Sequence, residues 1–121
     1  MLRHFFRAKI HRARVTAADL NYEGSITIDE TLMEAAGILP WEKVQVLNLS
    51  NGARAETYVI PGKANQGDIV MNGAIARMAQ VGDRVIILSY CLCSEEEIKT
   101  LQPVTVLVDE NNHMVRVVKK K

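Results

Sequence analysis

Apolar and polar residues alternate over short stretches along most of the chain, and turn residues separate these stretches. Alternation puts every second side chain on the same face of an extended strand, so the pattern predicts strands with one buried face. The predicted strands are residues 8–15, 26–28, 44–49, 53–60, 85–92, 104–108 and 114–118. Many short strands at turn spacing are typical of a small closed barrel rather than an open sheet.

Local signals predict the turns and short helices between these strands. The turns are Asn51-Gly52, Gly67-Asp68, Gly82-Asp83 and Asp109–Asn112. Asp29 is placed to cap a helix over residues 30–36, which Gly37 would end. Ser94 precedes a run of glutamates and predicts a capped helical turn, and residues 74–79 predict a further short helix. We therefore expect a mainly β fold with short helices.

Length and composition fit one globular domain over residues 1–121. Of these residues 48% are hydrophobic, which excludes a disordered chain. The formal net charge is +1, so the chain has no overall attraction for a polyanion. Basic residues do concentrate before residue 20 and at Lys119-Lys120-Lys121. A solvated face and a frayed tail explain them more simply than an anion site does.

Several kinds of segment and site are not indicated. No apolar run reaches the length of about 18 residues that a membrane span requires. The N-terminus lacks the apolar core of a secretory signal, so we expect a cytoplasmic protein. Cys91 and Cys93 would share one strand face near the distance limit for a disulfide, and they have no nearby histidine pair for zinc. We therefore expect reduced thiols and no metal site.

The Gly24-Ser25 step, directly before an alternating strand, is a candidate for self-cleavage. The serine hydroxyl lies next to the carbonyl of Gly24, and glycine tolerates the strained backbone that an attack on this carbonyl requires. The attack would convert an amide into an ester, and elimination from the ester would leave a new terminal carbonyl group. Most Gly-Ser pairs are plain turns, so this pair leaves both interpretations open.

Several separated blocks, taken in order, resemble one known family. The blocks are Lys9-Ile10-His11-Arg12, Tyr22-Glu23-Gly24-Ser25, Ala35-Ala36-Gly37-Ile38-Leu39, Asn51-Gly52 with Arg54, Thr57 and Tyr58, Asn72-Gly73-Ala74, and Val81-Gly82-Asp83 with Val85-Ile86-Ile87. Together they span nearly the whole chain and are similar to the pyruvoyl-dependent aspartate 1-decarboxylases, which make β-alanine for pantothenate synthesis. The resemblance implies a double-psi β-barrel and a homotetramer with active sites at subunit interfaces.

By this resemblance, Ser25 is the nucleophile that attacks the carbonyl of Gly24. Self-cleavage would give chains 1–24 and 25–121 and would convert Ser25 into a pyruvoyl group with release of ammonia. Thr57 would assist by stabilising the oxyanion intermediate. L-Aspartate would then form a Schiff base with the pyruvoyl group, which takes up the electrons left when the α-carboxylate departs.

The resemblance also implies the residues that bind the substrate. Arg54 and Lys9 would hold the carboxylates of the aspartate dianion. Tyr58 would return a proton to the carbanion as a general acid. From the residues alone, Tyr58 is equally well a cross-strand aromatic, and Thr57 is an ordinary β-branched strand residue.

Asn72 and the backbone of Gly73 and Ala74 would, by the same resemblance, hydrogen-bond the substrate or the pyruvoyl group. Taken alone, an Asn-Gly pair is more often a turn. His11 matches a family position near the site, although a single histidine on a strand is more often structural. The resemblance leaves open whether maturation needs a partner protein.

The chain departs from relatives at three positions. Leu47 replaces a tryptophan of some relatives and makes the pocket wall less aromatic. Ile75 stands where a smaller residue is familiar, which would narrow the site or change the maturation rate. Ile26 replaces a cysteine of some relatives, and we expect little effect because it lies beyond the scissile bond.

Two other interpretations belong to different classes of protein. The basic N-terminus and residues 37–44 resemble a swapped-hairpin β-barrel regulator that binds DNA. Such binding needs clustered cations, and the net charge of +1 with few aromatic residues argues against it. The other interpretation is a structural barrel without activity, which the presence of Lys9, Ser25, Arg54, Thr57 and Tyr58 argues against.

Overall fold

Strands make up half of the structure, a computed structural model that describes residues 1–120. Lys121 of the predicted basic tail therefore lies outside the described residues. The strands are β1 (Arg3–Arg14), β2 (Ala17–Asp19), β3 (Ser25–Asp29), β4 (Lys43–Asn48), β5 (Arg54–Gly62), β6 (Ile69–Asn72), β7 (Arg84–Cys93), β8 (Val104–Val108) and β9 (Met114–Lys119). The helices are α1 (Glu30–Ala36), α2 (Glu95–Ile98) and the 3₁₀ helix η1 (Gly73–Met78). The predicted fold class, mainly β with short helices, is confirmed.

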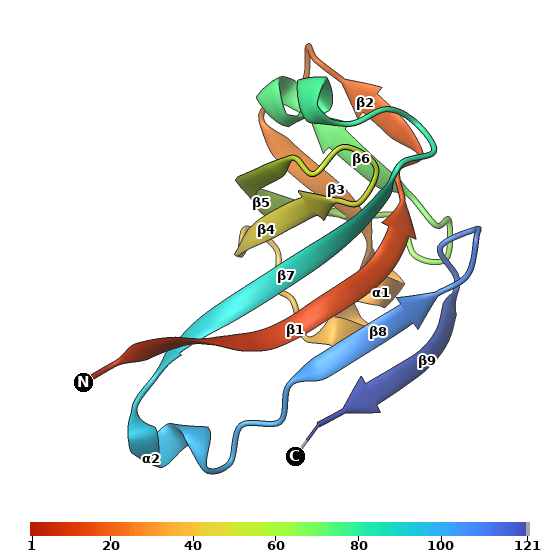
Figure 1. Cartoon of the computed structure of the whole chain (residues 1–121). Coiled ribbons are helices and arrows are strands. Elements are labelled where there is room, and N and C mark those ends of the chain that lie inside the picture. Colours follow the sequence, from red (N-terminus) through yellow and green to blue (C-terminus); the bar gives the residue numbers. More distant parts are fainter. Residues whose placement is uncertain (121) are drawn as a thin grey trace.

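One nine-stranded sheet joins all strands in the order β2-β6-β3-β5-β4-β7-β1-β8-β9. The sheet contains three parallel pairs (β1–β8, β2–β6 and β3–β5) among antiparallel ones, so the chain is not a simple meander. The long β1 and β7 run side by side along the molecule, and the β8–β9 hairpin extends the sheet beyond β1 (Figure 1). The hydrogen-bonded order of the sheet is open, with β2 and β9 as its edges, so the sheet does not close into the small barrel that the strand spacing predicted.

The chain between β1 and β2 nevertheless connects two separate parts of the curled sheet. The backbone of Val15 bonds to Asp83 at 2.9 Å and to Gly82 at 2.8 Å, both just before β7. The next residue, Thr16, donates its N–H to Ile69 of β6 at 2.8 Å. A few loop bonds thus link the β1–β7 side to the β2–β6 side in place of a continuous ladder.

Alternating apolar side chains from the strands fill the interior, and α1 adds one apolar face. Full burial of each such side chain contributes about 1.5–3 kcal/mol to folding. The main core residues are Ile10, Ile26, Ile28, Val44, Val46, Val59, Ile69, Met71, Val85, Ile87 and Val106 from strands, with Leu32, Met33 and Ala36 from α1.

Asp29 fixes the junction between β3, α1 and the loop that leads to β6. Its carboxylate accepts hydrogen bonds from the backbone N–H groups of Thr31 (2.8 Å), Asn65 (3.0 Å) and Gly67 (2.8 Å), and the residue is 1% exposed. Gly37 ends the helix in the left-handed conformation with φ 72°. The predicted cap, helix span and terminating glycine are all confirmed.

Other local predictions are confirmed with shifted ends. The capped turn after Ser94 is α2, with reciprocal bonds between Ser94 and Glu97. The strand predicted to stop before Pro61 continues to Gly62. Pro61 lies opposite Ile28 of β3, whereas β4 pairs with β5 only as far as Tyr58 and leaves that side of Pro61 outside a ladder. The short, fully exposed β2 was not predicted.

The cysteines lie on one face of β7, as expected for residues two apart. Cys91 and Cys93 are free, with their Sγ atoms 3.3 Å apart. Burial, followed by the neighbouring Cys93 thiol, raises the pKa of the Cys91 thiol. Within residues 1–120 no group of three His, Cys, Asp or Glu side chains is placed to hold a metal ion. None of the helices there has the length and apolar character that crossing a bilayer requires.

We predict that Asp29→Ala lowers the free energy of unfolding by about 2–4 kcal/mol, because it removes a helix cap and leaves buried N–H groups without an acceptor. Urea denaturation followed by circular dichroism measures the change. Asp19→Ala is the matched control, since within residues 1–120 the exposed Asp19 carboxylate accepts only from the N–H of Asn21 at 3.0 Å. An equally stable Asp29→Ala protein would contradict the role of this carboxylate.

Candidate active site

The hydroxyl of Ser25 is fully enclosed and held from two sides. Ser25 opens β3 and is 0% exposed. Its Oγ donates a hydrogen bond to the carbonyl of Glu23 at 3.0 Å and accepts one from Nδ2 of Asn72 at 3.1 Å. Antiparallel pairing of β3 with β6 sets this contact, because Ser25 lies directly opposite Asn72. The hydroxyl therefore has one orientation next to the Gly24 carbonyl.

Asn72 links two hydroxyl groups of β3. Its Nδ2 also donates to Oγ1 of Thr27 at 3.0 Å, and the residue is 3% exposed. Ser25 and Thr27 are two residues apart on a strand and so share a face. Sequence reasoning missed Thr27, although its position two residues after Ser25 was a usable signal.

The backbone of Gly73 approaches Gly24 so closely that no other residue fits there without movement. A Cβ atom on Gly73 would lie 2.7 Å from the Cα and 2.8 Å from the N of Gly24. Gly73 also has φ 71°, in the left-handed region that favours glycine. The start of η1 thus packs directly against the peptide before Ser25, whereas a Cβ on Gly24 itself would meet nothing within 4 Å.

Parallel pairing of β3 with β5 places the predicted residues of β5 beside the Gly24-Ser25 step. Ile26 lies opposite Val59, so the same register one residue earlier puts Ser25 level with Tyr58. Gly24 precedes β3 in a bend, and Thr57 precedes Tyr58 in β5. Ser25 and Tyr58 lie on the sheet face opposite to the buried Ile26 and Val59.

Arg54 and Tyr58 lie on the same outward face of β5. They are four residues apart, so their Cα atoms are about 13 Å apart. Arg54 is exposed and lies opposite Leu47, while Tyr58 is half-buried. The ring of Tyr58 stacks on Trp41 with 5.7 Å between ring centroids. Thr57 is half-buried and belongs to the other face of the strand.

Lys9 is not brought to Ser25 within one chain. It lies on β1, and both β7 and β4 intervene between β1 and β5. Its ammonium lies 5.7 Å from the centre of the Phe6 ring. Two cavities, of about 310 Å³ near Asp29 and of about 240 Å³ near Lys9, are both lined by residues other than Ser25. The latter is lined by Lys9, His11, Thr105, Leu107, Val118 and Lys120.

His11 faces the cavity beside Lys9. Burial, followed by the charges of Lys9 and Arg12, lowers the pKa of His11, so the imidazole is neutral at pH 7. Its Nδ1 is buried and has no hydrogen-bond partner among residues 1–120. The geometry places His11 next to Lys9 and away from Ser25.

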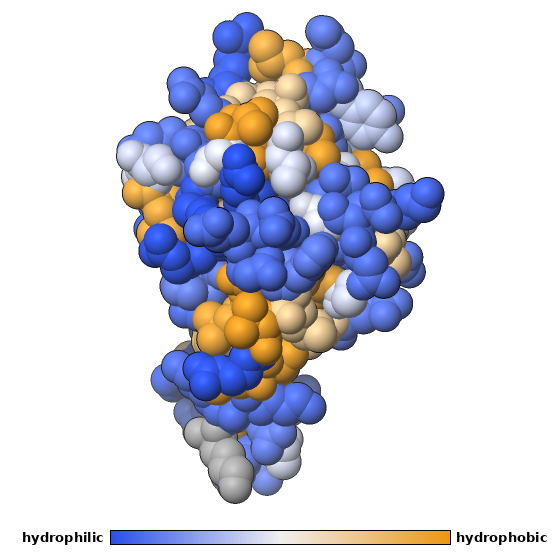
Figure 2. Space-filling view, turned by 90° about the vertical axis from the view of Figure 1, so that its right-hand side faces the viewer, coloured by the Kyte–Doolittle hydropathy of each residue, from blue (hydrophilic) through white to orange (hydrophobic). Residues whose placement is uncertain are grey.

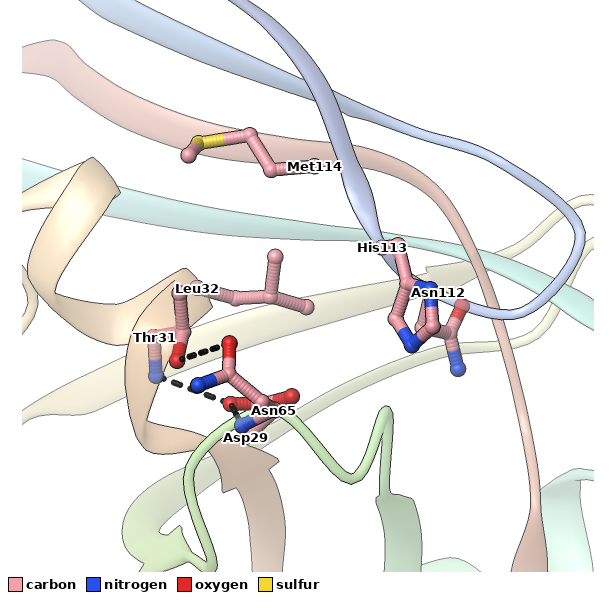
Figure 3. A pocket seen from close by; sticks show the side chains of 7 residues that line it. All are labelled: Asp29, Thr31, Leu32, Asn65, Asn112, His113 and Met114. Carbon is pink, nitrogen blue, oxygen red and sulfur yellow. Dashed lines mark hydrogen bonds between the residues drawn. The ribbon is translucent and has the colours of Figure 1, made fainter.

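The cavity of about 310 Å³ lies at the other end of β3, where Asp29 and Thr31 face Asn65 (Figure 3). His113 and Met114 approach it from the β8–β9 hairpin (Figure 3). The Asp29 carboxylate is already occupied by backbone N–H groups of the chain. This cavity therefore follows from the helix cap, and His113 is the other titratable side chain in its lining.

The positions that depart from relatives lie in different environments. Leu47 is half-buried between Arg54 and Ile86 of the neighbouring strands. Ile75 is 6% exposed and belongs to the core, and Ile26 is fully buried on the face opposite to Ser25.

Comparison with known proteins places the chain in a family. The model of the family described as aspartate decarboxylase matches residues 1–115. An aspartate 1-decarboxylase of Caldicellulosiruptor saccharolyticus is 60% identical over 100% of this chain and 94% of that protein. One of Carboxydothermus hydrogenoformans is 58% identical over 95% of this chain and 91% of that protein. One of Lactiplantibacillus plantarum is 57% identical over 96% of this chain and 89% of that protein.

A rationally designed protein, mkDPBB_sym_86, shares 14% identity with this chain at a TM-score of 0.49, over 64% of this chain and 90% of that protein. This structural similarity is too low to assign a fold. The sequence relatives and the family model agree with the resemblance of the separated sequence blocks. The chain belongs to the aspartate decarboxylase family.

Proposed function

We propose that this chain decarboxylates L-aspartate to β-alanine and CO₂ in pantothenate biosynthesis, with a pyruvoyl group made from its own Ser25. The observation that carries the proposal is the enclosed Ser25 hydroxyl, held between Glu23 and Asn72 directly after Gly24. The relatives named aspartate 1-decarboxylase support the reaction. The close approach of Gly73 to Gly24 supports the proposal, because it restricts the backbone directly before the peptide to be cleaved.

Self-cleavage begins when Oγ of Ser25 bonds to the carbonyl carbon of Gly24. The bond from that carbon to the Ser25 nitrogen breaks, and the hydroxyl proton passes to the nitrogen. The ester then loses the Cα proton of Ser25 as the Cβ–O bond breaks, which frees Gly24 as a carboxylic acid. One water enters and one ammonia leaves to give the pyruvoyl group. Thr57, the residue before Tyr58 in β5, is the proposed donor to the oxyanion.

In the decarboxylation, the pyruvoyl group supplies an electron sink for the carbanion left after loss of CO₂. Arg54 holds a substrate carboxylate through paired hydrogen bonds of its guanidinium. Tyr58, level with position 25, returns the proton to the substrate carbon. Asn72 and the N–H groups of Gly73 and Ala74 orient the groups at the site.

Lys9 supplies the second cation from a neighbouring subunit of a homotetramer, with active sites at the subunit interfaces. Its distance from β5 within one chain supports this arrangement. Exposed apolar side chains also support it, since extensive apolar surface marks contact sites. On the face that carries the edge strand β9, apolar patches lie between polar ones (Figure 2), and Val115 is 67% exposed.

The alternative of a DNA-binding regulator is not supported. The family model covers residues 1–115, which include the basic N-terminus and residues 37–44 on which that interpretation depended. In the structure Arg7 pairs with Glu42 at 2.6 Å, so one of these cations is already neutralised within the chain.

We predict that Ser25→Ala abolishes both self-cleavage and β-alanine formation, because the variant has no nucleophile and no source of the pyruvoyl group. Denaturing gels measure cleavage, and chromatography of the products measures β-alanine. Ser50→Ala is the control, since Ser50 is exposed in a turn. Normal β-alanine production by Ser25→Ala would rule out the proposed cofactor.

Arg54→Ala is expected to leave self-cleavage complete and to raise KM for aspartate about 10- to 100-fold, the loss expected for a charge-assisted hydrogen-bond pair. Steady-state kinetics on the cleaved protein measure KM. Arg77→Ala, which removes another exposed arginine, should behave as the unaltered protein. Unchanged KM and kcat for Arg54→Ala would remove Arg54 from the site.

Gly73→Ala is expected to slow self-cleavage at least about tenfold, which corresponds to about 1.4 kcal/mol in the barrier. The added Cβ would displace Gly24, 2.7 Å away, from the Ser25 hydroxyl. Gly52→Ala is the matched control, because Gly52 also has a positive φ of 76° but a Cβ there meets nothing within 4 Å. Equal cleavage rates for the two variants would contradict the role of this close approach.

A further inference from the structure

Trp41, the sequence's only tryptophan, stacks on the ring of Tyr58. The ring centroids are 5.7 Å apart and the planes differ by 27°, an offset-stacked geometry that is favourable for aromatic pairs. Trp41 is nevertheless 71% exposed, so burial in the core does not hold the indole in place. The contact with Tyr58 must be set by the segment that carries Trp41.

The backbone of this segment is fixed against β5 next to Tyr58. The N–H of Trp41 donates to the carbonyl of Val59 at 2.8 Å, and the N–H of Val59 donates to the carbonyl of Glu42 at 3.1 Å. Lys43 then lies directly opposite Tyr58 in the β4–β5 pair. These bonds hold Trp41 at φ 73°, a conformation that residues other than glycine rarely adopt.

A half-buried charge cluster fastens the same segment to the long strands. Glu42 accepts from the guanidinium of Arg7 at 2.6 Å, from the hydroxyl of Ser89, and from the N–H of Leu39 at 3.1 Å. Arg7 also donates to the carbonyl of Gly37 at 3.0 Å. Burial raises the pKa of Glu42, but the hydrogen bonds from Ser89, Leu39 and Arg7 outweigh it and lower the pKa, so Glu42 stays charged.

We propose that Trp41 is a positioning residue for Tyr58 in the decarboxylation. Tyr58 is level with position 25, and its ring must hold one orientation for the hydroxyl to deliver a proton at that position. The stacked indole provides that orientation from a segment anchored by Glu42. This inference rests on the proposed function, in which Tyr58 is the proton donor.

The test compares variants of Trp41 in the cleaved, full-length protein. Asparagine tolerates a positive φ but has no ring, so Trp41→Asn removes the stack without adding backbone strain. We expect kcat for aspartate to fall about threefold to tenfold, the range of one aromatic contact, with KM unchanged and self-cleavage complete. Trp41→Phe keeps a ring and should restore most of kcat. Leu39→Ala, an exposed change in the same segment, should have no effect.

A double-variant cycle separates positioning from a general structural role. In a Tyr58→Phe background the hydroxyl is gone, so adding Trp41→Asn should lower kcat no further. A full additional loss of kcat in that background would overturn the inference. The fluorescence of Trp41 offers an independent check: Tyr58→Ala should shift its emission, while Tyr58→Phe should preserve it.

The outcomes distinguish this inference from the proposed function. If Tyr58→Phe lowers kcat and Trp41→Asn leaves it unchanged, the positioning role of Trp41 is wrong and the proposed function stands. If Tyr58→Phe leaves kcat unchanged, Tyr58 is not the proton donor and the role of Trp41 falls with it. Loss of self-cleavage in Trp41→Asn would also overturn the inference, because it would show that Trp41 shapes the Gly24-Ser25 step itself.

Discussion

The site depends on one side-chain amide, that of Asn72. Its Nδ2 donates to Oγ of Ser25 at 3.1 Å and to Oγ1 of Thr27 at 3.0 Å. Ser25 and Asn72 are buried and Thr27 is half-buried, so these hydrogen bonds satisfy polar groups that have little access to water. The Ser25 hydroxyl is therefore fixed by the same bonds that join β3 to β6.

The sheet places the other groups around that hydroxyl. β3 lies between antiparallel β6, which contributes Asn72, and parallel β5, which brings Tyr58 level with Ser25. The far end of β3 is held by the Asp29 cap, so the strand is fixed at both ends. Gly73 packs against Gly24 and so restricts the backbone directly before Ser25. The contacts that orient Ser25 are therefore the same ones that fix β3 between β5 and β6.

Local signals in the sequence predicted those elements whose causes are local. The Asp29 cap, the helix over residues 30–36 and Gly37 were all predictable, because a cap, an amphipathic turn and a terminating glycine lie within a few residues. The open strand order was not predictable from local signals. The two parts of the sheet are joined by loop bonds of Val15 and Thr16 to residues more than fifty positions away. β2 is too short and too exposed to leave an apolar pattern.

The residues of the candidate site likewise divide into some that the sequence indicated and some that it did not. The family resemblance named Ser25, Asn72 and Gly73, which the fold brings together, and also Lys9, which one chain keeps several strands away. Thr27 and Trp41 were missed. The contact of Trp41 with Tyr58 follows from the β4–β5 register and from a positive φ at a tryptophan, and neither can be inferred from residue types.

The most direct test of the self-made cofactor is the intact mass of the purified protein under denaturing conditions. The account predicts two chains, one ending at Gly24 and one beginning at position 25, the larger chain lighter by one ammonia than its serine form. A single chain of 121 residues that stays uncut on warming, yet forms β-alanine from aspartate, would contradict it.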